Sequence, residues 1–134
     1  MAKVLPMPKK IIQTDRAPAP VGAYNQATLA GNLLFVSGQI AIDPDSGELR
    51  THGIEAETQQ VMDNLKAIVE AGGSSMDQVL KCEVFVSDME NFGRINTVYA
   101  TYFNEATAPA RALVQVANLP KYVNVEISCI ALVE

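Results

Sequence analysis

The chain has 134 residues, of which 49% are hydrophobic and 19% are charged, and its formal net charge is −5. This composition is typical of one globular domain and excludes a disordered chain. The acidic balance disfavours a protein that binds a phosphate backbone, because such a protein needs clustered lysines and arginines.

Three further features lead us to expect a cytoplasmic protein. No apolar run approaches the ~20 residues that span a bilayer, and Pro6 and Pro8 interrupt the segment where a signal peptide would have its apolar core. Cys82 and Cys129 each lie in an apolar, strand-like run without the spacing of a disulfide framework. We expect two buried free thiols in a reducing compartment.

The first 50 residues predict three strands and their connections. A proline-rich loop at 15–22 cannot join the centre of a sheet. A turn is expected at 30–32, and a second turn cluster at 43–47. The strands are expected at 9–14, 23–29 and 33–37, the last being apolar on both faces.

Helical periodicity is clearest from Ile54 to Ala71, and Gly72-Gly73 is expected to end this helix. The apolar positions form a stripe of Ile54, Val61, Met62, Leu65, Ile68 and Val69. The charged positions are expected to point away from the core, and they are Glu55, Glu57, Asp63, Lys66 and Glu70.

A fourth strand is expected at 79–86, followed by a second helix. Ser87 and Glu90 have the spacing of a capping box, in which each side chain binds the backbone of the other residue. The apolar residues that this helix is expected to bury are Phe92, Ile95, Tyr99, Tyr102 and Phe103.

Two last strands carry the most informative polar residues, Arg111 and Glu126. Pro109 favours extended geometry, so the chain enters a strand in which Arg111 shares a face with Leu113. A guanidinium beside apolar surface needs an acidic partner or a ligand, and its planar fork suits a carboxylate. Two interpretations stay open: a structural ion pair between Arg111 and Glu126, or a functional site.

About six strands and only two helices are predicted, so the helices can cover one face of the sheet. Several strands are apolar on both sides, and the second face is therefore expected to pack against other copies of the chain. Arg111 and Glu126 would then lie on that face, at subunit junctions, where small-ligand sites are common. The expected fold class is α/β (α+β), a single domain spanning residues 1–134 with its core at about 10–133.

Three stretches together resemble the RidA/YjgF family of reactive-intermediate deaminases, and the match extends from about Lys10 to Val133. The resemblance implies a chorismate-mutase-like fold and a homotrimer with three sites at its subunit interfaces. The stretches are Gly22–Ala27, Val36–Ile40, and Ala108–Arg111 together with Leu119–Lys121 and Val125–Ile127.

The resemblance also implies an activity. Family members that carry the arginine hydrolyse imine and enamine acids such as 2-aminoacrylate to 2-keto acids and ammonia. By this likeness Arg111 holds the substrate carboxylate, Glu126 holds or activates water, and Tyr24 lines the pocket. Ser37, Gly38, Asn96 and Leu113 match further substrate-binding positions. No cofactor or metal is expected, because the imine carbon is already electrophilic.

The chain departs from the family pattern at three places. Leu113 stands where many relatives have a cysteine, Ala23 replaces a common proline, and Ser128-Cys129 replaces a Glu-Ala pair. The arginine is retained, so the deaminase interpretation is kept while the substrate preference stays open. The pKa of Glu126 also stays open, since burial would raise it and a nearby Arg111 would lower it.

Each site residue has a structural alternative. Tyr24 could serve only to pack an interface, Ser37 could be a turn serine, and Asn96 could brace neighbouring backbone. His52 is expected to be a solvated loop residue. For the whole protein, the alternatives are a module that binds keto acids without turnover and, least favoured by the charge, a ribonuclease or translation inhibitor.

Overall fold

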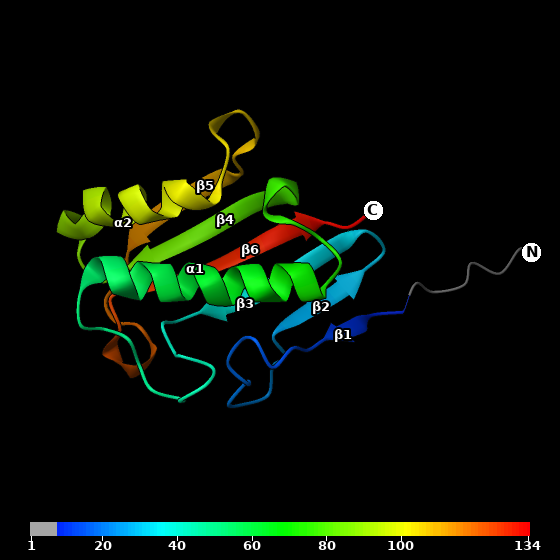
Figure 1. Cartoon of the computed structure of the whole chain (residues 1–134), viewed down its shortest axis with the longest axis horizontal. Coiled ribbons are helices and arrows are strands. Elements are labelled where there is room, and N and C mark those ends of the chain that lie inside the picture. Colours follow the sequence, from blue (N-terminus) through cyan, green and yellow to red (C-terminus); the bar gives the residue numbers. More distant parts are fainter. Residues whose placement is uncertain (1–7) are drawn as a thin grey trace, which may run out of the picture.

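The computed structural model describes residues 8–134 and contains a six-stranded mixed sheet with two helices lying along one face (Figure 1). The strand order is β1-β2-β3-β6-β4-β5, and only the β4–β5 pair is parallel. The α+β expectation is confirmed. The strands are β1 (Lys10–Ile12), β2 (Ala27–Ala30), β3 (Leu33–Gln39), β4 (Val79–Val86), β5 (Ala110–Gln115) and β6 (Val125–Leu132).

Helix α1 (Ile54–Ala71) has the predicted bounds and packs on β3 and β6. All six residues of its apolar stripe are buried, and they meet core residues such as Leu34, Val84 and Ile127 from the sheet. The helix ends as predicted, because Gly73 adopts a left-handed φ of 88° that glycine tolerates without cost. No helix among residues 8–134 is long and apolar enough to cross a bilayer.

The expected strand at 23–29 is wrong over its first half, since β2 begins only at Ala27. The reason is a set of side-chain bonds that favour a loop here. Gln26 turns away from the sheet and bonds the backbone of Thr14, Ala17 and Pro18. The Ser37 hydroxyl donates to the Asn25 carbonyl at 2.6 Å, which holds the loop against β3.

Helix α2 (Phe92–Tyr99) is shorter than predicted and is preceded by a 3₁₀ turn at Met89–Asn91. The capping box is wrong: Asp88 accepts from the Glu90 amide, while the Ser87 hydroxyl bonds the Asn124 side chain. Ile95 and Tyr99 are buried as expected, Tyr102 and Phe103 are partly buried, and Phe92 is 41% exposed. Phe92 is therefore not a core residue.

Glu57 is the clearest error of the helical pattern, because it was expected to point outward and is completely buried. Its carboxylate accepts hydrogen bonds from the Asn124 amide at 2.7 Å, the Asn124 side chain at 2.8 Å and the Val125 amide at 3.0 Å. These bonds tie α1 to the start of β6, one residue before Glu126. A buried carboxylate with three donors is satisfied without a cation.

The face of the sheet opposite the helices is only partly apolar. Phe35 and Val114 are exposed on it, at 43% and 45%, which fits the expectation of an uncovered apolar surface. Lys81 and Glu83 form an ion pair on the same face, with a nitrogen–oxygen distance of 3.6 Å. The expected dry face is thus a mixture of apolar and charged side chains.

Replacing Glu57 by leucine is expected to lower the free energy of unfolding by about 3 kcal/mol, since three buried or partly buried donors lose their acceptor. Urea denaturation at fixed protein concentration measures the change. The control is Glu55→Leu, two residues away on α1, whose carboxylate is exposed and paired with Arg94. It should change the free energy much less, and equal losses in the two variants would show that the buried bonds contribute little.

Candidate functional site

Arg111 lies on the edge strand β5, on the side of the sheet that the helices cover. The parallel register pairs Arg111 with Cys82, which is completely buried beneath the helices. Leu113 pairs with Val84 and shares this side, as the alternation predicted. Because β5 is an edge strand, the Arg111 side chain remains exposed although it lies on the covered side.

Three residues of α2 hold the guanidinium of Arg111. Asn96 Oδ1 accepts a hydrogen bond from Nη1 at 2.8 Å. The Cζ atom lies 4.8 Å from the centre of the Tyr99 ring and 5.7 Å from that of Phe92, within the range of cation–π attraction. Asn96 thus braces the side chain of Arg111 and not the neighbouring backbone, which was the structural alternative. The exposed Phe92 ring contacts the same guanidinium.

A cavity of about 510 Å³ opens beside this guanidinium, and we call it the arginine pocket. Among residues 8–134, no carboxylate lies within ion-pair distance of Arg111. The fork therefore keeps donors that Asn96 does not occupy. The lining residues are Asn96, Tyr99, Ala100, Phe103, Glu105, Ala108, Pro109 and Arg111.

Glu126 lies on the opposite, uncovered face of the sheet. It pairs with Phe85 on β4, while its neighbours Val125 and Ile127 point into the core. Burial raises the pKa of Glu126 above its ordinary value. Within one chain, burial therefore raises the pKa of Glu126, whereas the sequence left the direction of this shift open.

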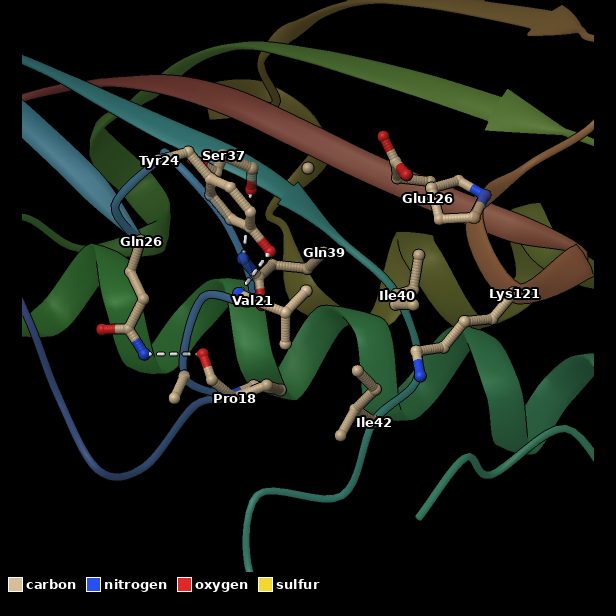
Figure 2. A pocket seen from close by; sticks show the side chains of 13 residues that line it. Pro18, Val21, Tyr24, Gln26, Ser37, Gln39, Ile40, Ile42, Lys121 and Glu126 are labelled. Atoms are coloured by element: carbon tan, nitrogen blue, oxygen red, sulfur yellow. Dashed lines mark hydrogen bonds between the residues drawn. The ribbon is translucent and has the colours of Figure 1, made fainter. Parts of the chain in front are cut away.

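Glu126 borders a second cavity, of about 460 Å³, which we call the glutamate pocket (Figure 2). Tyr24, Ser37 and Gly38, three of the residues that the family likeness names, line this cavity, and the Tyr24 hydroxyl accepts a hydrogen bond from the Val21 amide at 3.3 Å. The lining residues are Pro18, Ala19, Val21, Tyr24, Gln26, Ser37, Gly38, Gln39, Ile40, Ile42, Pro120, Lys121 and Glu126.

Gly38 determines where the Glu126 side chain can lie. A Cβ atom at position 38 would collide with Glu126 Oε2 and would stand 2.8 Å from its carboxyl carbon. The carboxylate therefore rests directly on the backbone of β3, near the irregularity between Val36 and Gln39. Only glycine leaves room for this arrangement.

The two pockets do not meet within one chain. Arg111 and Glu126 lie on opposite faces of the sheet, with β4 between their strands. The expectation that both residues share the uncovered face is wrong. Arg111 pairs with the buried Cys82, so both side chains lie on the face that the helices cover. The structural ion pair between them is excluded within a chain for the same reason.

Buried amides on the helix layer fix one wall of the glutamate pocket, and the sequence analysis missed them. Asn64 on α1 donates to the carbonyls of Ile40 and Ile42 at 3.2 and 2.9 Å. Gln60 donates to Asn64, and Arg50 donates to Gln60. The sequence contained a sign of this network, because Gln60 and Asn64 are amides four residues apart on the apolar side of a helix.

The two cysteines and the histidine are placed as expected. Cys82 and Cys129 are buried free cysteines that face each other across β4 and β6, and burial raises the pKa of both thiols. His52 is exposed in the loop before α1. Within residues 8–134 no three histidine, cysteine or acidic side chains come together as a metal site.

Comparisons with known proteins converge on one family. The model of the family described as Endoribonuclease L-PSP matches residues 14–133. A RutC family protein of Synechocystis is 50% identical over 126 residues, which cover 93% of this chain and 97% of that protein. A rat protein named 2-iminobutanoate/2-iminopropanoate deaminase is 45% identical over 123 residues, covering 92% of this chain and 89% of that protein.

A solved structure is similar in three dimensions as well. The Escherichia coli protein TdcF, crystallised with bound serine, has a TM-score of 0.88 and 42% identity to this chain. The match covers 93% of this chain and 99% of TdcF. At this identity, the likeness extends beyond a shared fold.

Proposed function

The chain belongs to the YjgF/RidA family of Endoribonuclease L-PSP proteins, and from that premise we propose that it hydrolyses 2-imino acids to 2-keto acids and ammonia. The rat and Escherichia coli relatives named as 2-iminobutanoate/2-iminopropanoate deaminases support this activity, at 45% and 44% identity. The serine in the TdcF structure supports a site for a small amino-acid-like carboxylate.

The proposal rests on one observation: the group that would bind the substrate carboxylate and the group that would act on water lie in separate pockets of one chain. The arginine pocket offers a free guanidinium fork, and the glutamate pocket offers a partly buried carboxylate. A single small substrate can reach both groups only if different copies supply them. The proposed enzyme is therefore an oligomer, a homotrimer by the family likeness, with each site built from the arginine pocket of one copy and the glutamate pocket of its neighbour.

Arg111 is proposed to hold the substrate carboxylate. Asn96 occupies one side of the guanidinium, and the Phe92 and Tyr99 rings fix its plane. The open side of the fork can then form two parallel bonds to a carboxylate. This contact orients the imine carbon before the reaction and lowers the entropic cost of the encounter.

Glu126 is proposed to act on water. The carboxylate accepts a proton from water as the oxygen bonds to the imine carbon, and it passes this proton to the imine nitrogen to give a carbinolamine. The carboxylate then accepts the proton of the carbinolamine hydroxyl and passes it to the amino nitrogen as the carbon–nitrogen bond breaks, so that the carbonyl forms and ammonia leaves. A carboxyl group with a raised pKa is suited both to accept and to release this proton. An enamine such as 2-aminoacrylate enters the same route after a proton is added at its terminal carbon.

Tyr24 and Ser37 are proposed to complete the polar side of the pocket. The Tyr24 hydroxyl accepts from Val21, so its own proton is free to donate to the substrate. The Ser37 hydroxyl donates to Asn25, so its lone pairs are free to accept. Leu113 contributes apolar surface on the side of the sheet where Arg111 lies.

The family description also includes an endoribonuclease, and the chain favours that activity less. Its net charge is −5, and Lys81 on the uncovered face is paired with Glu83. An RNA substrate would need a row of unpaired cations to hold its phosphates. RNA cleavage lost on substitution of both Arg111 and Glu126 would reverse this ranking.

The direct test couples the protein to a threonine or serine dehydratase and follows capture of free imine by semicarbazide. The wild type should suppress semicarbazone formation, and Arg111→Lys should abolish the suppression because an ammonium cannot form the two parallel bonds. Arg94→Lys is the matched control, since Arg94 is an exposed α2 arginine paired with Glu55. It should remain fully active.

Two results would contradict the proposal. If the wild type leaves the trapping rate unchanged while binding keto acids saturably, the protein is a binding module. If Arg111→Lys keeps full activity, the carboxylate is held elsewhere.

Gly38→Ala is expected to separate stability from activity. The new methyl group would displace the Glu126 carboxylate, a flexible side chain, so the fold should persist while hydrolysis falls by at least about 100-fold. Gly93→Ala is the control, because a Cβ there meets nothing within 4 Å. Thermal unfolding and the semicarbazide assay measure the two effects. Retained activity in Gly38→Ala would show that the position of Glu126 is not critical.

A further inference from the structure

Two cysteines face each other inside the sheet, and the proposed deaminase chemistry uses neither of them. Cys82 on β4 and Cys129 on β6 are direct partners in the antiparallel register, and these strands are neighbours beneath the helices (Figure 1). Both thiols are free and buried, with exposed fractions of 0% and 4%. The chain has two cysteines in all, so the fold brings both of its thiols to one point.

The distance between the two residues suits a metal ion held between their sulfur atoms. Directly opposite residues of an antiparallel pair have Cβ atoms about 4.5–5.5 Å apart. Two bonds of about 2.3 Å, the length of a zinc–thiolate bond, would place two sulfurs about 4.6 Å apart in a line. Two side chains on the same face of adjacent strands can therefore present both sulfurs to one ion without a movement of the backbone.

A tyrosine beside the thiols has an unused hydrogen-bond donor. Tyr99 is 6% exposed, and its hydroxyl is the one buried side-chain nitrogen or oxygen that lacks a hydrogen-bond partner among residues 8–134. Burial and the neighbouring thiols of Cys82 and Cys129 raise the pKa of Tyr99, so the hydroxyl keeps its proton. A neutral thiol is a weak acceptor, whereas a thiolate accepts a charge-assisted hydrogen bond. The hydroxyl would therefore gain a partner when the thiols become thiolates.

The positive charge of Arg111 favours the same change. Arg111 pairs with Cys82 in the parallel register, and its Cζ atom lies 4.8 Å from the centre of the Tyr99 ring. Burial raises the pKa of Cys82, while the Tyr99 hydroxyl and the Arg111 guanidinium act to lower it. Two thiolates that share one monovalent cation carry a net charge of −1, and the guanidinium balances that charge.

From these contacts we propose that Cys82 and Cys129 form a two-coordinate site for a soft monovalent cation, Cu(I). Thiolates are the ligands that select Cu(I), and two of them in a line complete its coordination. A structural zinc ion would need four ligands, and no third histidine, cysteine or acidic side chain joins the pair within residues 8–134. Tyr99 and Arg111 stabilise the bound form without touching the ion.

Binding exchanges protons for the metal and changes no oxidation state. Two thiols and one Cu(I) ion give a bis-thiolate complex, and two protons pass to solvent. Tyr99 lines the arginine pocket and neighbours both thiols, so a movement of its ring would admit the ion from that pocket. The site is separate from the proposed hydrolysis of imines and does not depend on it.

The test titrates the full-length, reduced protein, without oxygen, with Cu(I) supplied as its bicinchoninate complex. The colour of that complex reports the copper that the protein removes. The wild type should bind one ion per chain, release two protons for each ion, and show two sulfur neighbours in a line by X-ray absorption. Cys82→Ala and Cys129→Ala should each fail to retain the ion. Cys129→Ala installs the alanine of the family pattern, so its fold should persist, and circular dichroism checks this.

Tyr99→Phe separates the proposed role of the hydroxyl from a purely structural one. The hydroxyl has no partner in the metal-free protein, so its removal should leave the unfolding temperature unchanged or raise it. The affinity for Cu(I) should fall by about 10–100-fold, as for other groups that support metal ligands. His52→Ala and Met89→Ala are the controls, because they remove an exposed imidazole and an exposed thioether and should bind Cu(I) as the wild type does.

Three results would overturn the site. If the chelator retains all the copper while both thiols stay free, the cysteine pair does not bind Cu(I). If His52→Ala or Met89→Ala loses the ion and the cysteine variants keep it, the wild type binds an adventitious ion only. Release of one proton per ion, with a single sulfur neighbour, would show that the two thiols do not act together. Unchanged affinity in Tyr99→Phe would remove the hydroxyl from the proposal.

Discussion

Strand alternation is the constraint on which the site depends. Successive side chains of a strand point to opposite faces, and the register across β4 sends Arg111 to the helix side and Glu126 to the uncovered side. No side-chain rotation can bring the two groups through a packed sheet. The chemistry proposed here therefore requires a second copy, and the mixed apolar and charged surface around Phe35, Lys81 and Glu83 is the face available to receive it.

The support for each pocket comes from polar groups inside the helix layer. Glu57 fixes the start of β6, Asn64 fixes the chain after β3, and Asn96 fixes the guanidinium of Arg111. Glu57 and Asn64 are buried and are satisfied by the segments that they hold, so the removal of either side chain would leave unpaired donors or acceptors behind. The helices thus act as a rigid frame for residues that lie on both faces of the sheet.

The sequence predicted the regular elements well, because their signals are local. The periodic stripe and the terminal glycines defined α1 at both ends, and the apolar run defined β4. The prediction from sequence failed where contacts between segments far apart in the chain override the local pattern. Glu57 looks like an exposed helical glutamate until β6 supplies three donors, and Phe92 looks like a core residue until Arg111 covers its ring. The opposite placement of Arg111 and Glu126 depends on the register of three strands, which periodicity within one strand does not reveal.

The most direct test of the central claim mixes two inactive variants, Arg111→Lys and Glu126→Gln, in one oligomer. If each site takes its arginine from one copy and its glutamate from another, random mixing restores both groups at roughly a quarter of the sites. The expected result is recovery of imine hydrolysis to about that fraction of the wild-type rate. Mixed oligomers that remain as inactive as the separate variants would contradict the account.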